Sequence, residues 1–500
     1  MANLYKTWPK NVRFKWGEIM KKLTLITNTS YVVGCENDHH YLLKNGQVAF
    51  RGNEIVFVGR DYPAKPGEID EIIDAKGGIV IPGLINLHCH VAASPVEKGF
   101  LEDLGSPTMY MTGLYEYLRV THLAPEDQMN VLQFSLGDIM VRGSTTIFEL
   151  GLGSPEMVEA IGQTGIRAYI GLMARAGVFM TKDGFKPYYE WDEPNAFKRL
   201  EETLRRRDQY DGSFDGRIHI GLYPGQVDTC TPDYLDEVAR VMRDNPKMPL
   251  AIHAAQTINE YNRIVQLYGM TPAHFLAEHG IIGPQVQLGH YIMPCGHSLN
   301  RLKLKGELEL LAKTGTNVIH CPWSYARRGM IMESLQKYLD LGINVALGTD
   351  TFTQDMIFEM KCAAVCCKIA ENGDPFTGTA AEVFNAATIA GAKALGRDDL
   401  GRLQPGAKAD IVIVRTDNFD CMPLRDPIKV LVYSASSHDI GRVIVDGQTL
   451  VQDGKVLRGD QEKMYHDMQK AGERMWKNVP NRDYKGRTAD QISPFSFPLR

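Results

Sequence analysis

Four histidines and one aspartate end short apolar runs that lie far apart in the chain. They are His88, His90, His253, His290 and Asp350. Imidazole nitrogens combined with a carboxylate suit Zn²⁺ or Fe²⁺ and leave a coordination position open for water. Burying such groups together in apolar surroundings is unfavourable unless a cation compensates them. The pattern therefore predicts a site for a divalent metal ion that activates water.

The segment His88-Cys89-His90 shows how one strand could supply two of these groups. Side chains alternate in direction along a strand, so His88 and His90 face the same side and Cys89 faces the opposite one. Cys89 is expected to be a buried structural thiol. A single histidine on a strand is more often a packed core residue than a ligand. The joint position of the polar residues at several strand ends is what favours a metal site.

The elements that must position these residues occupy the middle of the chain. Eight short apolar runs alternate with amphipathic segments such as 125–141, 232–243 and 356–371. The runs are 81–90, 145–150, 167–174, 217–224, 250–256, 286–293, 317–324 and 344–350. Apolar strands that alternate with helices indicate a parallel sheet covered on both faces. Eight such units predict an α/β fold, a (β/α)8 TIM-like barrel over 81–398, with the strand ends converging on one site.

Both flanks of the barrel contain short strands. Asp446-Gly447 and Asp453-Gly454 supply two-residue turns that favour hairpins. We expect residues 1–80 and 399–457 to form one small β-sandwich domain from both chain ends. The last segment, 458–500, is predicted to be a charged helix followed by an extended arm, either a surface arm or a dimer strap.

Composition limits the class of protein. The 500 residues carry 55 Lys and Arg against 60 Asp and Glu, a net charge of −5, which disfavours nucleic-acid binding. No apolar run approaches the roughly 20 residues that span a bilayer. The polar stretch Met1–Trp16 does not resemble a signal peptide. Nine scattered cysteines match neither a disulfide framework nor a zinc motif, so we expect a cytoplasmic protein.

Three motifs resemble those of a known family. Residues 81–90, Ile-Pro-Gly-Leu-Ile-Asn-Leu-His-Cys-His, are similar to the opening signature of the amidohydrolase superfamily. Leu347-Gly348-Thr349-Asp350 resembles its metal aspartate on the eighth strand. The segment 401–410 is similar to its return into the small β domain. Within the superfamily, the chain most resembles the branch of cytosine/guanine deaminases and triazine hydrolases, and the resemblance covers roughly residues 21–457.

This resemblance implies a site with one metal ion per subunit, Zn²⁺ or, as the alternative, Fe²⁺. It implies ligation by His88, His90, His253 and Asp350, with His290 beside the attacking water. Asp350 would take a proton from that water, and His290 would orient it. Binuclear relatives carry a lysine on the fourth strand, whereas residues 217–224 contain none. The resemblance also implies a homo-oligomer, a dimer or a larger assembly.

Two positions depart from the pattern of this branch. The fifth strand normally reads His-x-x-Glu, and its glutamate moves protons, but this chain has Gln256. An amide can hold a substrate but cannot act as a general acid or base. The seventh strand normally reads Pro-x-Ser-Asn, and here it reads Pro-Trp-Ser-Tyr. Trp323 and Tyr325 could line an aromatic pocket or pack in the core, and Glu97, in the loop after the first strand, is a candidate substrate contact.

Three functions are consistent with these residues. The preferred one is a metal-dependent hydrolase that displaces an amino, alkylamino or halide group from an N-heterocycle or a related small molecule. The second is hydrolysis of a urea, carbamate or amide C–N bond by the same site, which needs ring protonation less. The third is a non-catalytic barrel that serves as an assembly protein, for which loss of metal ligands would be expected.

Overall fold

A computed structural model describes residues 22–151 and 153–500 and contains the predicted barrel. Eight parallel strands form one sheet. In barrel order they are β8 (Leu84–Cys89), β9 (Ser144–Leu150), β10 (Arg167–Met173), β13 (Ile218–Tyr223), β14 (Leu250–Ala254), β15 (Val286–His290), β16 (Asn317–His320) and β17 (Val345–Leu347). The amide of Asp350 donates to the carbonyl of His88 over 2.7 Å, and the amide of His90 donates to the carbonyl of Asp350 over 3.0 Å. These bonds join the two edge strands and close the barrel.

Helices cover the outside of the barrel, and three of them match the predicted segments closely. Those three are α3 (Pro125–Val141), α7 (Pro232–Asp244) and α13 (Met356–Ala370). The start of α7 is set by Pro232 in its first turn and by the Thr231 hydroxyl, which accepts from the amide of Tyr234. The other covering helices are α4 (Pro155–Thr164), α5 (Glu193–Tyr210), α8 (Ile258–Tyr268), α9 (Pro272–Glu278), α10 (Glu307–Thr314), α12 (Leu335–Asp340), α14 (Ala380–Ala386) and α15 (Ile389–Ala394).

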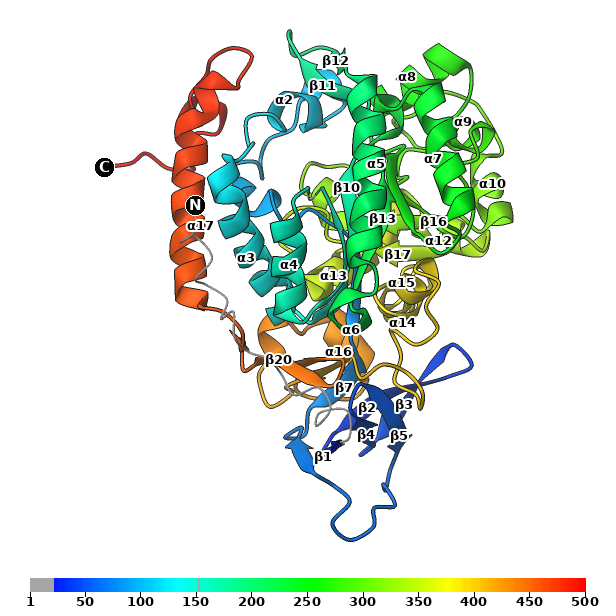
Figure 1. Cartoon of the computed structure of the whole chain (residues 1–500), viewed down its shortest axis with the longest axis vertical. Helices are drawn as coiled ribbons and strands as arrows, with labels where there is room; N and C mark the ends of the chain where they lie inside the picture. The colour runs from blue at the N-terminus through cyan, green and yellow to red at the C-terminus, as the bar shows by residue number, and fades with distance from the viewer. Residues whose placement is uncertain (1–21, 152) are drawn as a thin grey trace.

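Both ends of the chain build the β domain, which lies below the barrel in Figure 1. One sheet has the order β5-β4-β1-β6, and the other β21-β20-β19-β18-β7-β2-β3. Their strands are β1 (Leu23–Thr27), β2 (Tyr31–Glu36), β3 (His39–Lys44), β4 (Gln47–Arg51), β5 (Glu54–Gly59), β6 (Glu71–Asp74), β7 (Ile79–Pro82), β18 (Ile411–Val414), β19 (Ile440–Val445), β20 (Gln448–Gln452) and β21 (Lys455–Val456). Apolar residues of both sheets share one core.

This domain mixes the two flanks strand by strand. The C-terminal β18 pairs with the N-terminal β7 on one side and with β19 on the other. The predicted single strand 81–90 is divided between two strands. Ile81 and Pro82 belong to β7 of the β domain, and the first barrel strand, β8, begins at Leu84. Residues 1–21 of the predicted first segment, including Met1–Trp16, lie outside the described residues.

The segment after the β domain packs beside the barrel. Helix α17 (Gln461–Asn478) runs along α3 (Figure 1), and Arg474 pairs with Asp127. Apolar residues of this segment share a cluster with the loop after β8. Short helices precede the C-terminus, η5 (Val479–Asn481) and α18 (Ala489–Ile492), where the sequence suggested an extended arm.

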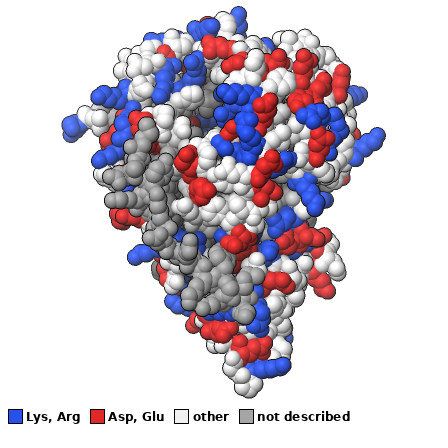
Figure 2. All heavy atoms as spheres, viewed as in Figure 1, with Lys and Arg blue, Asp and Glu red and all other residues white. Residues whose placement is uncertain are grey.

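Two further features complete the molecule. A hairpin of β11 (Gly177–Thr181) and β12 (Pro187–Trp191), which the sequence analysis did not predict, follows β10. Within residues 22–151 and 153–500, none of the helices is both long and apolar enough to cross a bilayer. Acidic and basic side chains interleave over the face shown in Figure 2.

Candidate metal centre and active site

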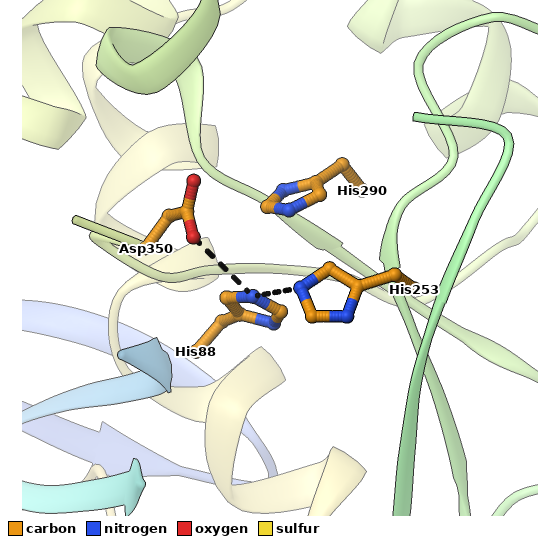
Figure 3. Close-up of side chains that lie close together, drawn as sticks. All are labelled: His88, His253, His290 and Asp350. Carbon is orange, nitrogen blue, oxygen red and sulfur yellow. Dashed lines mark hydrogen bonds and ion pairs between the residues drawn. The ribbon is translucent and has the colours of Figure 1, made fainter. Parts of the chain in front are cut away.

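The predicted metal-binding groups meet at the carboxyl end of the barrel strands. His88, His253, His290 and Asp350 each offer a ligand atom, and these atoms lie within 4.8 Å of one another (Figure 3). Nε2 of His88 lies 3.1 Å from Nε2 of His253 and 3.6 Å from Oδ1 of Asp350. Nε2 of His90 lies 3.3 Å from the same aspartate oxygen. The barrel therefore gathers all five groups at one point.

Backbone carbonyls fix the rings of two histidines. Nδ1 of His90 donates to the carbonyl of Leu150 over 2.6 Å, and Nδ1 of His253 donates to the carbonyl of Gly225 over 3.0 Å. A neutral imidazole with its hydrogen on Nδ1 keeps a lone pair on Nε2. The Nε2 lone pair of His253 therefore points at the ring nitrogen of His88. This arrangement fits a bound cation, which would accept the converging lone pairs.

Burial and mutual contact set the charges of these groups. Burial, followed by the charge of His88, holds the pKa of His253 and of His290 well below the ordinary value. Burial alone would raise the pKa of Asp350, but the contacts with His88 and His90 outweigh it and hold that pKa well below its usual range. A neutral imidazole and a charged carboxylate are the forms that ligate metal ions.

Glycines and an unusual backbone conformation allow this close packing. A Cβ on Gly289 would lie 2.6 Å from Cε1 of His88, and a Cβ on Gly348 would lie 2.6 Å from Cβ of His88. The ring of His88 thus occupies space that a side chain on β15 would fill, and its Cβ and backbone occupy space that a side chain after β17 would fill. Asp350 has a φ of 58°, in the left-handed region that non-glycine residues adopt rarely. Such strain is often found at functional sites.

A cavity of about 420 Å³ opens beside the metal-binding groups. Its lining includes His90, His253 and Asp350, together with the predicted substrate contacts Glu97 and Gln256. The lining also contains apolar side chains that the sequence analysis did not single out: Leu101, Leu114, Leu118, Met157, Met173, Phe179 and Met330. Glu97 lies on η1 (Ser94–Glu97), accepts from the Thr121 hydroxyl over 3.2 Å, and has its pKa raised by burial.

Of the two aromatic residues predicted for the pocket, Trp323 and Tyr325, only Tyr325 reaches the cavity. Tyr325, on α11 (Pro322–Ala326), lines the cavity, and its ring meets that of His290 edge to face at 4.9 Å. Among the described residues, the cavity lining does not include Trp323. Its ring instead packs edge to face on Phe358 of α13 at 4.9 Å, because α11 turns this side chain outward. This position corresponds to the packing alternative.

Gln256 is held from both sides. Its Oε1 accepts from the hydroxyl of Tyr325 over 3.0 Å, and its Nε2 donates to Oε1 of Gln226. The carboxylate of Glu260 accepts from the backbone amides of Ala255 and Gln256 over 2.6 and 3.1 Å. The amide therefore occupies a fixed orientation in the cavity wall.

Sequence reasoning missed several residues of this wall. Gln226, Glu149 and Arg175 line the cavity without having been predicted. Glu149 is the penultimate residue of the second barrel strand, so a charged residue in an apolar run could have revealed it. Gln226 and Arg175 follow strand ends in loops, where polar residues carry little information on their own.

Comparison with known proteins places these features in a family. The model of the Amidohydrolase family matches residues 79–450. The 5-methylthioadenosine/S-adenosylhomocysteine deaminase of Natronomonas pharaonis is 31% identical over 391 residues, which cover 77% of this chain and 84% of that protein. The 5'-deoxyadenosine deaminase of Methanosarcina mazei is 31% identical over 465 residues, covering 90% of this chain and 98% of the other.

Solved structures share the fold. An adenosine deaminase from Xanthomonas campestris with bound zinc superimposes with a TM-score of 0.76 at 23% identity, covering 90% of this chain and 98% of that one. An atrazine chlorohydrolase from Arthrobacter aurescens in complex with zinc gives 0.73 at 24% identity, covering 90% and 100%. With the barrel, the converging histidines and the family match in agreement, this chain belongs to the amidohydrolase family.

Proposed function

We propose that this chain is a zinc-dependent hydrolase that displaces an amino, alkylamino or halide group from a ring carbon of an N-heterocycle. The observation that carries the proposal is the convergence of His88, His90, His253 and Asp350 beside the cavity. The cavity volume of about 420 Å³ lies within the range of small-ligand sites, about 300 to 1,000 Å³. The relatives named above, deaminases and a chlorohydrolase, favour this class of reaction.

One ion per chain would be held by His88, His90, His253 and Asp350. The backbone bonds of His90 and His253 direct their Nε2 lone pairs inward. Strand β13 carries no lysine that could bridge a second ion. Nδ1 of His290 is buried and has no hydrogen-bond partner among the described residues, so its tautomer is not fixed. This freedom suits a group that orients the attacking water better than it suits a metal ligand.

The residues of the site divide the chemistry between them. When bound, the divalent ion lowers the pKa of water toward about 7 and supplies a nucleophile at neutral pH. Asp350 accepts the proton that the attacking water loses. His290 orients that water and stabilises the developing charge. Gln256 and Tyr325 hold the substrate ring, and the apolar side chains of the cavity exclude bulk water.

Hydrolysis of an acyclic urea, carbamate or amide is the second candidate. The fixed amide of Gln256 favours it, because the position that would protonate a ring nitrogen carries no ionisable group. Attack on such a carbonyl needs that proton less than displacement from a ring does.

The two candidates differ in their products. The zinc-loaded enzyme is tested on a panel of aminated, alkylaminated and chlorinated heterocycles, together with ureas and carbamates. We expect it to release ammonia, amine or chloride from a ring compound. Release of amine with carbonate from the acyclic compounds alone would favour the second candidate. A panel without any product would contradict both.

We also propose a reducing, cytoplasmic setting and a homo-oligomeric state. All nine cysteines lie among the described residues as free thiols, which supports a reducing compartment. Size-exclusion chromatography with light scattering tests the oligomeric state directly. A monomer at micromolar concentration would contradict that part of the proposal.

A further inference from the structure

Two cysteines lie on the outer face of α13, one helical turn apart. Cys362 and Cys366 are both partly exposed, and their Sγ atoms lie 3.8 Å apart. Residues four apart on a helix are neighbours on one face, so the helix itself presents the two thiols side by side. The exposed side chains of Val365 and Ile369 belong to the same face. Solvent can therefore reach a preformed pair of sulfur atoms.

The two thiols differ in acidity because they touch. The hydrogen bond between them, followed by burial, raises the pKa of Cys362, whereas the same bond lowers the pKa of Cys366 against the effect of burial. Cys362 is thus the S–H donor, and Cys366 is the acceptor that loses its proton first. The thiolate is the form of cysteine that binds metal ions. One sulfur is therefore ready to bind an ion, and the second lies within reach of the same ion.

The helix disfavours a disulfide bond within this pair. Cβ atoms four residues apart on a helix lie about 5 to 6 Å apart, whereas a disulfide needs about 3.5 to 4.5 Å. Forming that bond would require α13 to unwind locally, although the helix runs without interruption from Met356 to Ala370. An ion held between the two sulfur atoms requires no such movement.

The separation of the sulfur atoms matches that of two ligands of one metal ion. Two thiolates bound at about 2.3 Å to a tetrahedral zinc ion lie about 3.8 Å apart, which is the separation observed here. Thiolate sulfur is a soft donor that selects Zn²⁺ and softer cations over Mg²⁺ or Ca²⁺. The pair supplies two ligands, and water or a small thiol would complete the coordination.

We propose that Cys362 and Cys366 form a second metal site, which binds one zinc-like, thiophilic cation on the outer face of α13. The ion replaces the protons of both thiols, which pass to solvent, so binding needs no oxidant or reductant. Among the described residues, the cavity lining includes neither cysteine, so this site is separate from the metal centre of the barrel. We expect the barrel centre to fill first, because it offers four protein ligands against two.

Cadmium is the probe for this site. Charge transfer from thiolate to Cd²⁺ absorbs in the ultraviolet, and the nitrogen and oxygen ligands of the barrel centre give no such band. Reduced, zinc-loaded enzyme is titrated with Cd²⁺, and Mg²⁺ serves as the hard cation for comparison. We expect the absorption to saturate at one equivalent of Cd²⁺ per chain, and Mg²⁺ to leave it unchanged.

Serine variants test the two ligands separately. Cys366→Ser should weaken Cd²⁺ binding by about 100-fold or more, since even the partners that orient a metal ligand contribute about 10- to 100-fold to affinity. This variant keeps two thiols on α13, but the second, Cys367, is buried. Cys362→Ser should have the same effect. The matched control is Cys295→Ser, which removes another partly buried thiol and should leave the affinity unchanged.

Both cysteines are partly exposed, so the serine variants should keep the fold and the zinc of the barrel. Thermal unfolding and metal analysis check this, and Cys366→Ala replaces Cys366→Ser if the serine variant is unstable. Four results would overturn the inference: no charge-transfer absorption, saturation at half an equivalent or at two, wild-type affinity in Cys366→Ser, or an equal loss in Cys295→Ser. Because the readout is metal binding, its outcome does not depend on the proposed function.

Discussion

At the scale of single residues, the metal centre depends on which ring nitrogen of each histidine carries a hydrogen. Leu150 and Gly225 take the Nδ1 hydrogens of His90 and His253, whereas Nδ1 of His290 is buried without a partner among the residues described. The same difference distinguishes the two ligands His90 and His253 from His290, the group proposed to orient the attacking water. Replacing His90 by alanine should therefore have a different effect from replacing His290 by alanine.

We expect His90→Ala to lose bound zinc and His290→Ala to retain it. Both should lower kcat, the second by about 10²- to 10³-fold, the range for a lost group that stabilises developing charge. Metal analysis of the dialysed proteins together with steady-state kinetics checks the pair. Zinc lost from His290→Ala and kept by His90→Ala would reverse the assignment.

Gln256→Glu provides a second prediction at this scale. The new carboxyl group would stand in the cavity wall at the position that the amide of Gln256 now holds. We therefore expect Gln256→Glu to raise ammonia release from aminated rings, because a carboxyl group can pass a proton to a ring nitrogen and an amide cannot. The measurement is ammonia released per second, and a rate no higher than that of the wild type would contradict this role of the position.

The sequence predicted the five metal-binding groups because each ends an apolar run, and strand ends converge in a barrel. It did not predict Gln226 or Arg175, which line the cavity. Their roles depend on which side chains meet across a loop, and the spacing of residues along the chain carries no trace of such a contact. Nor could it place Trp323, because one turn of α11 decides which aromatic ring faces the cavity.

At the scale of elements, the loop after β8 forms one wall of the cavity and is supported by α17. Val96, Phe100 and Leu101 of that loop share an apolar cluster with Ala471 and Met475 of the helix. Leu101 also lines the cavity. The C-terminal segment therefore supports a substrate-facing wall from behind.

We expect Ala471→Asp to lower the free energy of unfolding by about 2 to 4 kcal/mol, because it buries a charge without a partner. It should also raise KM more than it lowers kcat, since the cavity wall loosens while the metal centre is untouched. Lys470→Asp, an exposed position on the same helix, is the matched control. Thermal unfolding and kinetics that do not distinguish the two variants would contradict the role of α17.

The strands and the long helices were predictable from apolar periodicity, with bounds close to those observed. Two features were not. The run 81–90 reads as one apolar strand, yet it is divided between two sheets at Gly83, which only the packing of the β domain explains. The hairpin β11–β12 lies between barrel units, where alternating strands and helices give no indication of an insertion.

At the scale of the whole molecule, a buried ion cluster ties the barrel to the β domain. Arg167 on β10 is 1% exposed and pairs with Asp410 at 3.2 Å and Asp446 at 2.7 Å. These aspartates flank strands of the β domain, where Asp410 precedes β18 and Asp446 follows β19. Burial would lower the pKa of Arg167, but the two carboxylates raise it above its usual range, so the guanidinium stays charged.

We expect Arg167→Met to lower the free energy of unfolding by about 3 to 5 kcal/mol, because it leaves two carboxylates buried without their main cation. The triple variant Arg167→Met/Asp410→Asn/Asp446→Asn should regain part of this loss. Arg205→Met removes an exposed surface pair and should change stability by less than about 0.5 kcal/mol. Denaturant unfolding measures all three, and similar values for Arg167→Met and Arg205→Met would refute the role of the cluster.

We propose that three imidazoles and one carboxylate hold a single divalent ion on which hydrolysis depends. The most direct test is a zinc titration of chelator-treated enzyme, followed by product release from the best substrate of the panel. We expect no activity without zinc and a linear return of activity that ends at one equivalent per chain. Full activity in the zinc-free protein, or a return that continues to two equivalents, would contradict it.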